Sequence, residues 1–307
     1  KAGEKNALVS LHIYDDAANA TKEVKLGNYN DFYIARMKWT NDANTLSAQV
    51  LNRHQNNLDL LFIDGTSGTS KVVLNEKDKA YVDVTDNLTY LKDNSFIWTS
   101  EKDGFNHIYL YDKTGKLKNQ VTKGNWEVTS YYGFDEKTKT VFYQSTENGS
   151  INRDIYRIAL DGKNKVRLSK NVGTSKATFS PNFQYYINTF SSASQPTTFT
   201  LNDAKAGKEL QVIENNEALA SSLKAYNLAT KEFFVLKTAK GNELNAWILK
   251  PKDFDPAKKY PVFMFQYSGP GSQQVANQWN NSNDYWFEML TQQGYIVACV
   301  DARGTGF

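Results

Sequence analysis

The sequence contains little cysteine and histidine, and it lacks any long apolar run. The single cysteine, Cys299, rules out an internal disulfide, and its apolar neighbours predict a small core residue. The three histidines, His12, His54 and His107, show no ligand spacing with a second histidine or a cysteine, so neither a metal site nor a cofactor is predicted. Because no run of about 18 apolar residues occurs, no membrane-spanning helix is predicted.

The sequence also lacks a large excess of charge of either sign. The chain has 36 basic and 33 acidic residues, a net charge of +3. The basic residues are scattered, which argues against a nucleic-acid partner. The length of 307 residues is enough for two domains, each with its own core. The 18 tyrosines and 17 phenylalanines favour strands over helices.

The first 220 residues or so carry a repeat in which an apolar strand ends in an aspartate turn. The turn aspartates recur at intervals of 42 to 49 residues, and they are Asp15, Asp64, Asp112, Asp161 and Asp203. Another strand lies about 15 residues before each of the last four turns; these strands are predicted at 47–51, 96–99, 141–144 and 185–188. Paired strands at this period predict a partial β-propeller of about four four-stranded blades over residues 1–222. A β-sandwich would not explain the recurrence.

The pattern changes beyond residue 222. A partly helical link is predicted at 216–228, and a hairpin is expected around Gly241. The run at 262–265 is continuous and apolar, which predicts a strand buried on both faces. A helix at 284–293 and a second apolar strand at 294–301 follow, as in the crossover of a parallel sheet. Loops at the carboxyl ends of such strands are where α/β folds place their chemistry.

Several of these segments resemble one known family. Lys259-Tyr260-Pro261, an apolar strand, Tyr267-Ser268-Gly269-Pro270, a helix and the closing Asp301-Ala302-Arg303-Gly304-Thr305-Gly306 are similar to the start of the hydrolase domain in the dipeptidyl peptidase IV family. The stretches at 99–111 and 121–128 also resemble blade segments of that family. The resemblance spans nearly the whole chain in order, and bacterial members, including prolyl tripeptidyl aminopeptidases, are the nearer relatives. It implies that residues 223–307 begin an α/β-hydrolase domain.

The resemblance also implies a function and one site residue. Members are serine aminopeptidases that release dipeptides, or tripeptides, after proline or alanine. Tyr267 matches the tyrosine that donates its hydroxyl to the oxyanion hole, a role that suits a phenol that is neutral at pH 7. Peptide substrates, a homodimer in the intact protein and a periplasmic or membrane-associated, extracytoplasmic location follow from the same resemblance. The substrate-binding residues stay unknown, because the family's paired glutamates have no counterpart here.

The catalytic triad is not recognisable in these residues. No Gly-x-Ser-x-Gly occurs, and all three histidines precede the hydrolase strands. A triad on this fold runs Ser, Asp, His along the chain, so we expect all three beyond Phe307. We therefore expect the chain to be an excised, inactive piece.

Two alternatives stay open. The propeller could be a binding module attached to a degenerate hydrolase, or the protein could be another clan member, such as an acylaminoacyl peptidase or an endopeptidase. Within the blades, His107 and Glu101 are expected to fix a hairpin, and Trp98 is expected in the core. Tyr81 is a weaker candidate for a residue that faces a substrate cavity.

Overall fold

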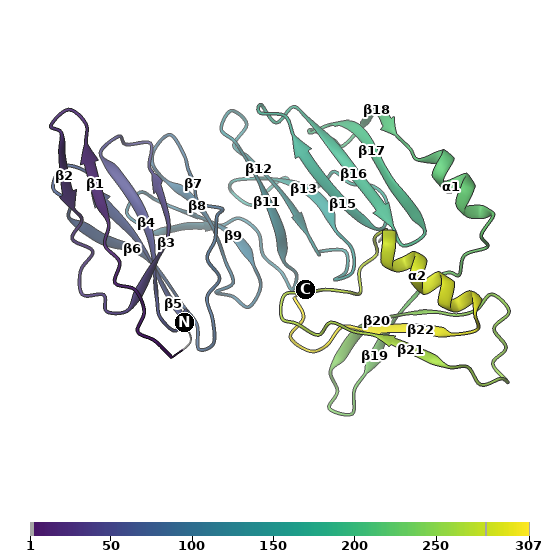
Figure 1. Ribbon diagram of the computed structural model, residues 1–307. Coiled ribbons are helices and arrows are strands. Elements are labelled where there is room, and N and C mark those ends of the chain that lie inside the picture. The colour runs from purple at the N-terminus through teal and green to yellow at the C-terminus, as the bar shows by residue number, and fades with distance from the viewer. Residues whose placement is uncertain (1–2, 280, 307) are drawn as a thin grey trace. The chain divides into compact units, whose positions relative to one another are not determined.

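The computed structural model describes residues 3–279 and 281–306, and most of its regular structure is strand (Figure 1). Contacts divide the chain into two compact units. The first comprises the residues up to Lys123 together with Ala159–Lys163, and the second comprises Gly124–Ile158 and the residues from Asn164 onward. Each unit is described by itself.

The first unit contains one two-stranded and two four-stranded antiparallel sheets, each with its strands in chain order. The hairpin consists of β1 (His12–Asp15) and β2 (Ala20–Glu23). The first four-stranded sheet consists of β3 (Phe32–Trp39), β4 (Thr45–Asn52), β5 (Asn57–Asp64) and β6 (Ser70–Lys77). The second consists of β7 (Thr89–Tyr90), β8 (Phe96–Ser100), β9 (His107–Tyr111) and β10 (Leu117–Gln120).

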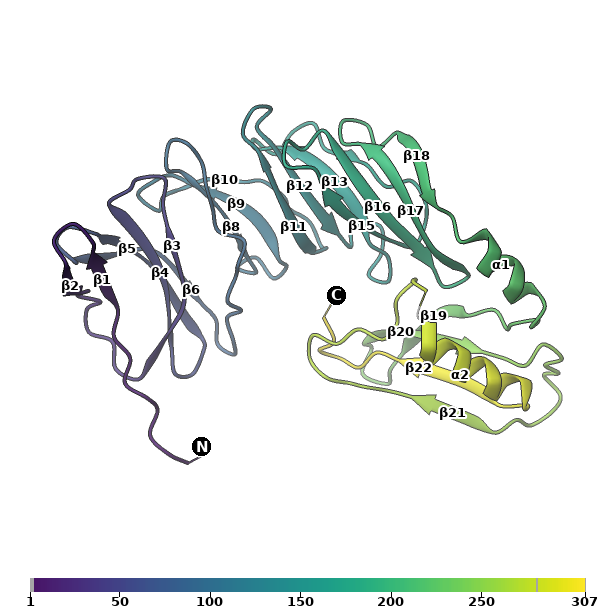
Figure 2. The same ribbon diagram turned by 45° about the horizontal axis from the view of Figure 1, so that its top comes forward.

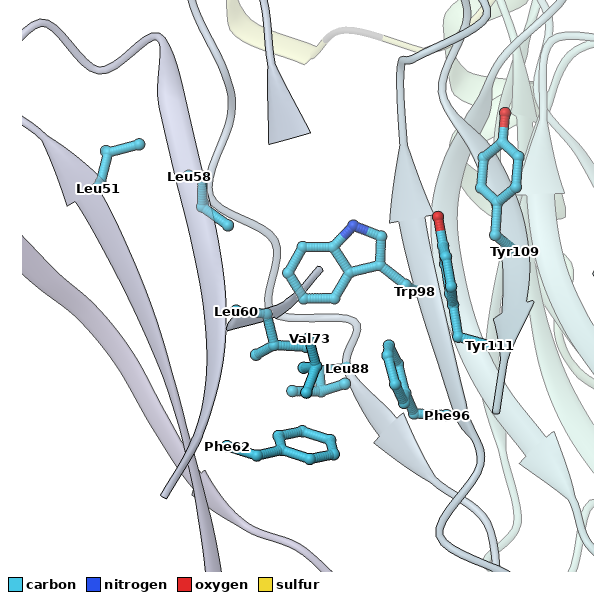
Figure 3. Packing of buried hydrophobic residues seen from close by; sticks show 10 residues of the cluster. All are labelled: Leu51, Leu58, Leu60, Phe62, Val73, Leu88, Phe96, Trp98, Tyr109 and Tyr111. Atoms are coloured by element: carbon cyan, nitrogen blue, oxygen red, sulfur yellow. The ribbon is translucent and has the colours of Figure 1, made fainter. Parts of the chain in front are cut away.

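The first unit has two buried clusters: one contains Leu11, Val24, Leu61 and Ile63, and the other lies between the two four-stranded sheets. Figure 3 shows Leu60 and Phe62 of β5 facing the side chains of Phe96 and Trp98 of β8. These positions are two residues apart in each strand, so both side chains of a strand fall on one face. The rings of Phe96 and Tyr111 stack with centroids 5.3 Å apart. The aromatic content of the sequence is therefore used to fill the space between sheets.

The second unit begins with two more antiparallel four-stranded sheets, again in chain order. The first consists of β11 (Val128–Asp135), β12 (Thr140–Ser145), β13 (Asp154–Ala159) and β14 (Val166–Arg167). The next consists of β15 (Thr174–Phe179), β16 (Tyr185–Ser192), β17 (Gln195–Asp203) and β18 (Glu209–Glu214). Phe142, Ile155 and Tyr186 are buried between them.

The predicted pairs of strands are confirmed as the two middle strands of each four-stranded sheet. They are β4 and β5, β8 and β9, β12 and β13, and β16 and β17. In the first three sheets these middle strands are largely buried, as their apolar sequences predict. In the fourth sheet, Tyr185 and Ile187 of β16 are exposed. The chain is thus mainly β, with four consecutive four-stranded meanders of the kind that form propeller blades.

The remainder of the second unit forms a different, mixed sheet. Its order is β19-β20-β22-β21, and only the β21–β22 pair is parallel. Helix α2 lies along one face of this sheet (Figure 2). The elements are α1 (Glu217–Lys224), β19 (Glu232–Lys237), β20 (Glu243–Leu249), β21 (Val262–Phe265), α2 (Asn281–Gln292) and β22 (Ile296–Val300).

One prediction about this sheet is wrong. Strand β21 is not buried on both faces, because Val262 and Met264 are 59% and 54% exposed. Phe263 and Phe265 alternate with them and pack against the core under α2. The reason is that β21 is an edge strand, and α2 covers only one face of the sheet within the described residues.

The predicted boundary at 222/223 falls inside the second unit, within α1, and stays a prediction. Neither described helix has the length and apolar character needed to cross a membrane.

Candidate functional site

Tyr267 lies two residues after β21, at the carboxyl end of a strand in the parallel pair. Its side chain is 67% exposed. The following residue, Ser268, has a φ of +59°, a conformation that turns the backbone sharply where the strand ends. Within the described residues the Tyr267 hydroxyl has no hydrogen-bond partner, so it is free to donate to a ligand.

The Tyr267 ring rests against its own loop at Gly269. A Cβ built on Gly269 would lie 2.5 Å from Cε1 of Tyr267, closer than any real contact allows. The same loop is closed by a turn in which the Ser272 N–H donates to the Gly269 carbonyl at 3.2 Å. The absence of a side chain at 269 therefore leaves room for the ring in its observed place.

Asp301 joins the Tyr267 loop to the end of the neighbouring strand. Because β21 and β22 are parallel, with Phe265 opposite Cys299, the loops that follow them meet at one edge of the sheet. The Asp301 side chain is 7% exposed. Its two carboxylate oxygens accept the backbone N–H groups of Gln274 and Val275, at 2.9 and 3.0 Å. The Asp301 N–H in turn donates to the Asn245 carbonyl in β20 at 3.0 Å.

A second contact joins the same loop to the loop before β13. The Gln273 amide donates to the Ser150 carbonyl at 2.9 Å, and its oxygen accepts from Arg153 Nη2 at 2.5 Å. Arg153 Nη1 also donates to the carbonyls of Ser150 and Asn152, each at 2.8 Å. Burial lowers the pKa of Arg153 to about 10, while nearby Glu127 opposes that shift, so the guanidinium stays charged at neutral pH.

Cys299 is a core residue, as predicted, and no nucleophile. The side chain is fully buried beside Trp247 and Val297. Burial, reinforced by the charge of Asp301, raises the pKa of its thiol to about 12. The reactive thiolate is therefore absent at neutral pH.

The residues singled out in the blades have structural surroundings. His107 is fully buried, and its Nδ1 lies 3.1 Å from Thr122 Oγ1, which accepts the Ile108 N–H at 2.9 Å. His107 thus contacts the segment that follows β10, whereas the predicted hairpin joins β8 to β9; in that turn the Glu101 carbonyl accepts the Gly104 N–H at 2.8 Å. Trp98 lies in the core, as predicted. Tyr81 is 50% exposed and lines a hollow of about 610 Å³ in the first unit, together with Trp98 and Glu101. Tyr81 stays a candidate for a residue that faces a substrate cavity.

Sequence reasoning missed the residues that hold the Tyr267 loop. Asp301 belongs to the motif quoted above, but no role followed from the motif itself. Gln273 and Arg153 gave no signal, because their contact joins residues 120 positions apart. A carboxylate directly after the second parallel strand was the one available clue.

Comparison with known proteins identifies the family. Residues 1–197 match the family model of the dipeptidyl peptidase IV N-terminal region. The chain is 30% identical over 320 aligned residues to dipeptidyl peptidase 4 of Trichophyton equinum. The alignment covers all of this chain but only 41% of that protein. The chain therefore spans about two fifths of the length of the curated relatives it matches.

Two solved structures are similar to this chain. The crystal structure of Porphyromonas gingivalis dipeptidyl peptidase 4 matches with a TM-score of 0.93 and 48% identity, over 100% of this chain and 43% of that one. A putative dipeptidyl aminopeptidase IV from Bacteroides ovatus matches with a TM-score of 0.82 and 26% identity, over 97% of this chain and 45% of that one. The chain belongs to the dipeptidyl peptidase IV family.

Proposed function

We propose that this chain is part of a serine dipeptidyl peptidase in which the Tyr267 hydroxyl stabilises the oxyanion. One observation carries the proposal: an exposed phenol with a free hydroxyl stands at the carboxyl end of a parallel strand, on a loop fixed by buried polar contacts. Family membership and the names of the relatives support peptidase activity for the whole protein.

The proposed chemistry uses a serine supplied by another part of the protein. Its hydroxyl adds to the carbonyl carbon of the scissile peptide bond, a histidine takes the proton, and the carbonyl oxygen becomes an oxyanion. Tyr267 donates its O–H to that oxygen. Residues 1–307 contain no Gly-x-Ser-x-Gly, so we place the Ser-Asp-His triad outside them.

The two parts of the chain take different roles in this proposal. Residues 1–222 form part of a β-propeller that admits only short, unfolded peptides, and four consecutive four-stranded meanders support this assignment. Residues 223–307 begin an α/β-hydrolase domain, supported by the parallel β21–β22 pair with α2 between its strands in sequence. Release of dipeptides or tripeptides after proline or alanine, a homodimer and a bacterial extracytoplasmic location belong to the same proposal.

The direct kinetic test is Tyr267→Phe in the full-length protein. Losing one oxyanion donor costs on the order of 10²- to 10³-fold in kcat, and we expect that loss with little change in KM. Tyr226→Phe is the matched control, since it removes the hydroxyl of another exposed tyrosine of the same unit; Tyr226 is 64% exposed. An unchanged kcat in Tyr267→Phe removes Tyr267 from the mechanism.

A second experiment addresses the chain alone. The purified chain 1–307 should not hydrolyse a Gly-Pro chromogenic substrate, because the proposed nucleophile is missing from it. Activity that co-purifies with this chain would contradict the placement of the triad. A full-length protein that also lacks a Gly-x-Ser-x-Gly motif and activity would instead favour a binding module with a degenerate hydrolase.

A further inference from the structure

The carboxylate of Asp301 is committed to the loop that carries Tyr267. Both of its oxygens accept backbone N–H groups of that loop, from Gln274 and Val275, and the side chain is 7% exposed. Hydrogen bonds from amides to a carboxylate are stronger than neutral ones, and they are stronger still away from water. Both carboxylate oxygens of Asp301 are therefore occupied by contacts within the protein, and we assign them no contact with a substrate.

The segment that Asp301 holds is also fixed from the side of the blade. Gln273, the residue just before the two bound amides, is locked by Arg153 and by the Ser150 carbonyl. Val275 is fully buried in the core under α2. Three consecutive residues, 273 to 275, thus have fixed side chains or fixed backbone amides.

Only five residues, 268 to 272, separate Tyr267 from this fixed segment. They include the turn closed by Ser272 and Gly269, and Gly269 contacts the Tyr267 ring directly. Fixing Gln273–Val275 thus fixes one end of a short, closed loop whose other end leaves β21. Because the loop is short and closed by a hydrogen bond, we expect a shift of the fixed segment to move the phenol as well.

We propose that Asp301 is a positioning residue that sets where the Tyr267 hydroxyl points. This inference rests on the proposed oxyanion role of Tyr267. Asp301 acts through Tyr267 alone: it places the O–H donor before the reaction begins, so that no reorganisation is needed as the oxyanion develops. A displacement of about 1 Å can cost on the order of 10²-fold in rate.

The isosteric variant Asp301→Asn isolates this role. An asparagine side chain keeps one acceptor oxygen but presents an NH₂ group to the second backbone N–H, so one of the two loop contacts is lost. We expect kcat to fall by about 10- to 10²-fold in the full-length enzyme, with KM changed by less than about threefold. Asp253→Asn is the matched control, because it makes the same chemical change at an exposed loop residue.

A double-mutant cycle separates positioning from general damage. The cycle compares the wild type, Asp301→Asn, Tyr267→Phe and the double variant, with thermal unfolding measured for each. If Asp301 acts through the phenol, adding Asp301→Asn to Tyr267→Phe lowers kcat little further. If the two losses multiply in full, or if Asp301→Asn alone leaves kcat unchanged, the inference is overturned.

The same cycle tests the positioning role of Asp301 separately from the oxyanion role of Tyr267. Tyr267→Phe without effect would overturn the oxyanion role itself, whereas a Tyr267 effect without coupling would overturn only the role of Asp301. Should Asp301→Asn fail to fold, Gln273→Met replaces it in the cycle. That variant removes the other anchor of the same segment, and the same coupling with Tyr267→Phe is expected.

Discussion

At the scale of single residues, the position of Tyr267 depends on what is missing beside it. Gly269 has no side chain, and its φ lies outside the left-handed region, so alanine would fit the backbone there. The added methyl group would, however, lie 2.5 Å from Cε1 of Tyr267 and would force the ring aside. Gly269 thus matters because of its contact with the ring and places no unusual demand on the main chain.

Gly269→Ala should therefore lower kcat in the full-length enzyme while leaving the fold intact. We expect a loss of up to about 10²-fold, the cost of moving a reacting group by about 1 Å. The thermal unfolding midpoint should stay within the experimental error of the wild type, because the ring moves into solvent and no core contact is lost. A wild-type kcat would show that the observed ring position is unimportant for the reaction.

Glu288 gives a prediction about pH. Its side chain is 8% exposed and accepts the Ala229 N–H at 2.7 Å. Burial raises the pKa of Glu288 above its ordinary value, with Asp284 adding to the shift and Lys231 opposing it. The folded protein therefore binds this proton more tightly than the unfolded chain does. Its contribution to stability is largest below the unfolded pKa and is lost as pH rises through the folded pKa.

Glu288→Gln should remove that dependence, since glutamine still accepts the Ala229 N–H but does not ionise. Unfolding free energies from urea titrations between pH 4 and neutral pH provide the measurement. We expect the wild type to lose stability relative to the variant as pH rises across this range. The reverse slope would mean that contacts to the ionised carboxylate outweigh the cost of burying it.

At the scale of elements, close packing between neighbouring sheets decides which turns tolerate a side chain. The turn between β9 and β10 contains Gly115, where a Cβ would lie 1.7 Å from the Val73 carbonyl oxygen of β6. Gly104, in the turn between β8 and β9, also has a positive φ but has nothing within 4 Å. The two glycines therefore share a backbone conformation and differ in the space around them.

Gly115→Ala should accordingly destabilise the protein more than Gly104→Ala. Both variants carry the cost of an L-residue at positive φ, about 1–2 kcal/mol. Only Gly115→Ala also overpacks the contact between sheets, which adds about 1–3 kcal/mol. Denaturant unfolding of the two variants measures the difference in the free energy of unfolding. Equal losses of stability would show that β6 moves aside at this contact with little cost.

Much of the element structure could be predicted, because apolar runs mark the middle strands of each sheet. The outer strands were harder: β7 and β14 have only two residues each, and β10 is largely polar. Exposure was misjudged at β21, since an edge strand and a central strand can share one apolar sequence. In the site, Tyr267 was predicted from a local motif. Arg153 and Gln273 were not, because contacts between distant segments leave no local pattern.

At the scale of the whole molecule, one face of the mixed sheet carries exposed apolar side chains on its two edge strands, β19 and β21. Phe234 and Leu236 of β19 and Val262 and Met264 of β21 are 42% to 59% exposed. Strand pairing places all four on one face, opposite the one that α2 covers. Exposed apolar side chains gathered on one face promote association in water.

The isolated chain 1–307 should therefore self-associate. Sedimentation velocity over a range of concentrations should show species larger than a monomer, and Val262→Lys with Met264→Lys should reduce them. The full-length protein provides the comparison, since the proposed hydrolase domain would cover this face. A chain that stays monomeric at every concentration would contradict the expectation.

The most direct test of the central claim is a crystal structure of the full-length protein with a serine-reactive transition-state analogue bound. The account predicts the Tyr267 hydroxyl at hydrogen-bond distance, about 2.7–3.1 Å, from the oxygen that mimics the oxyanion. A Tyr267 side chain turned away from that oxygen, with other donors in its place, would contradict the account.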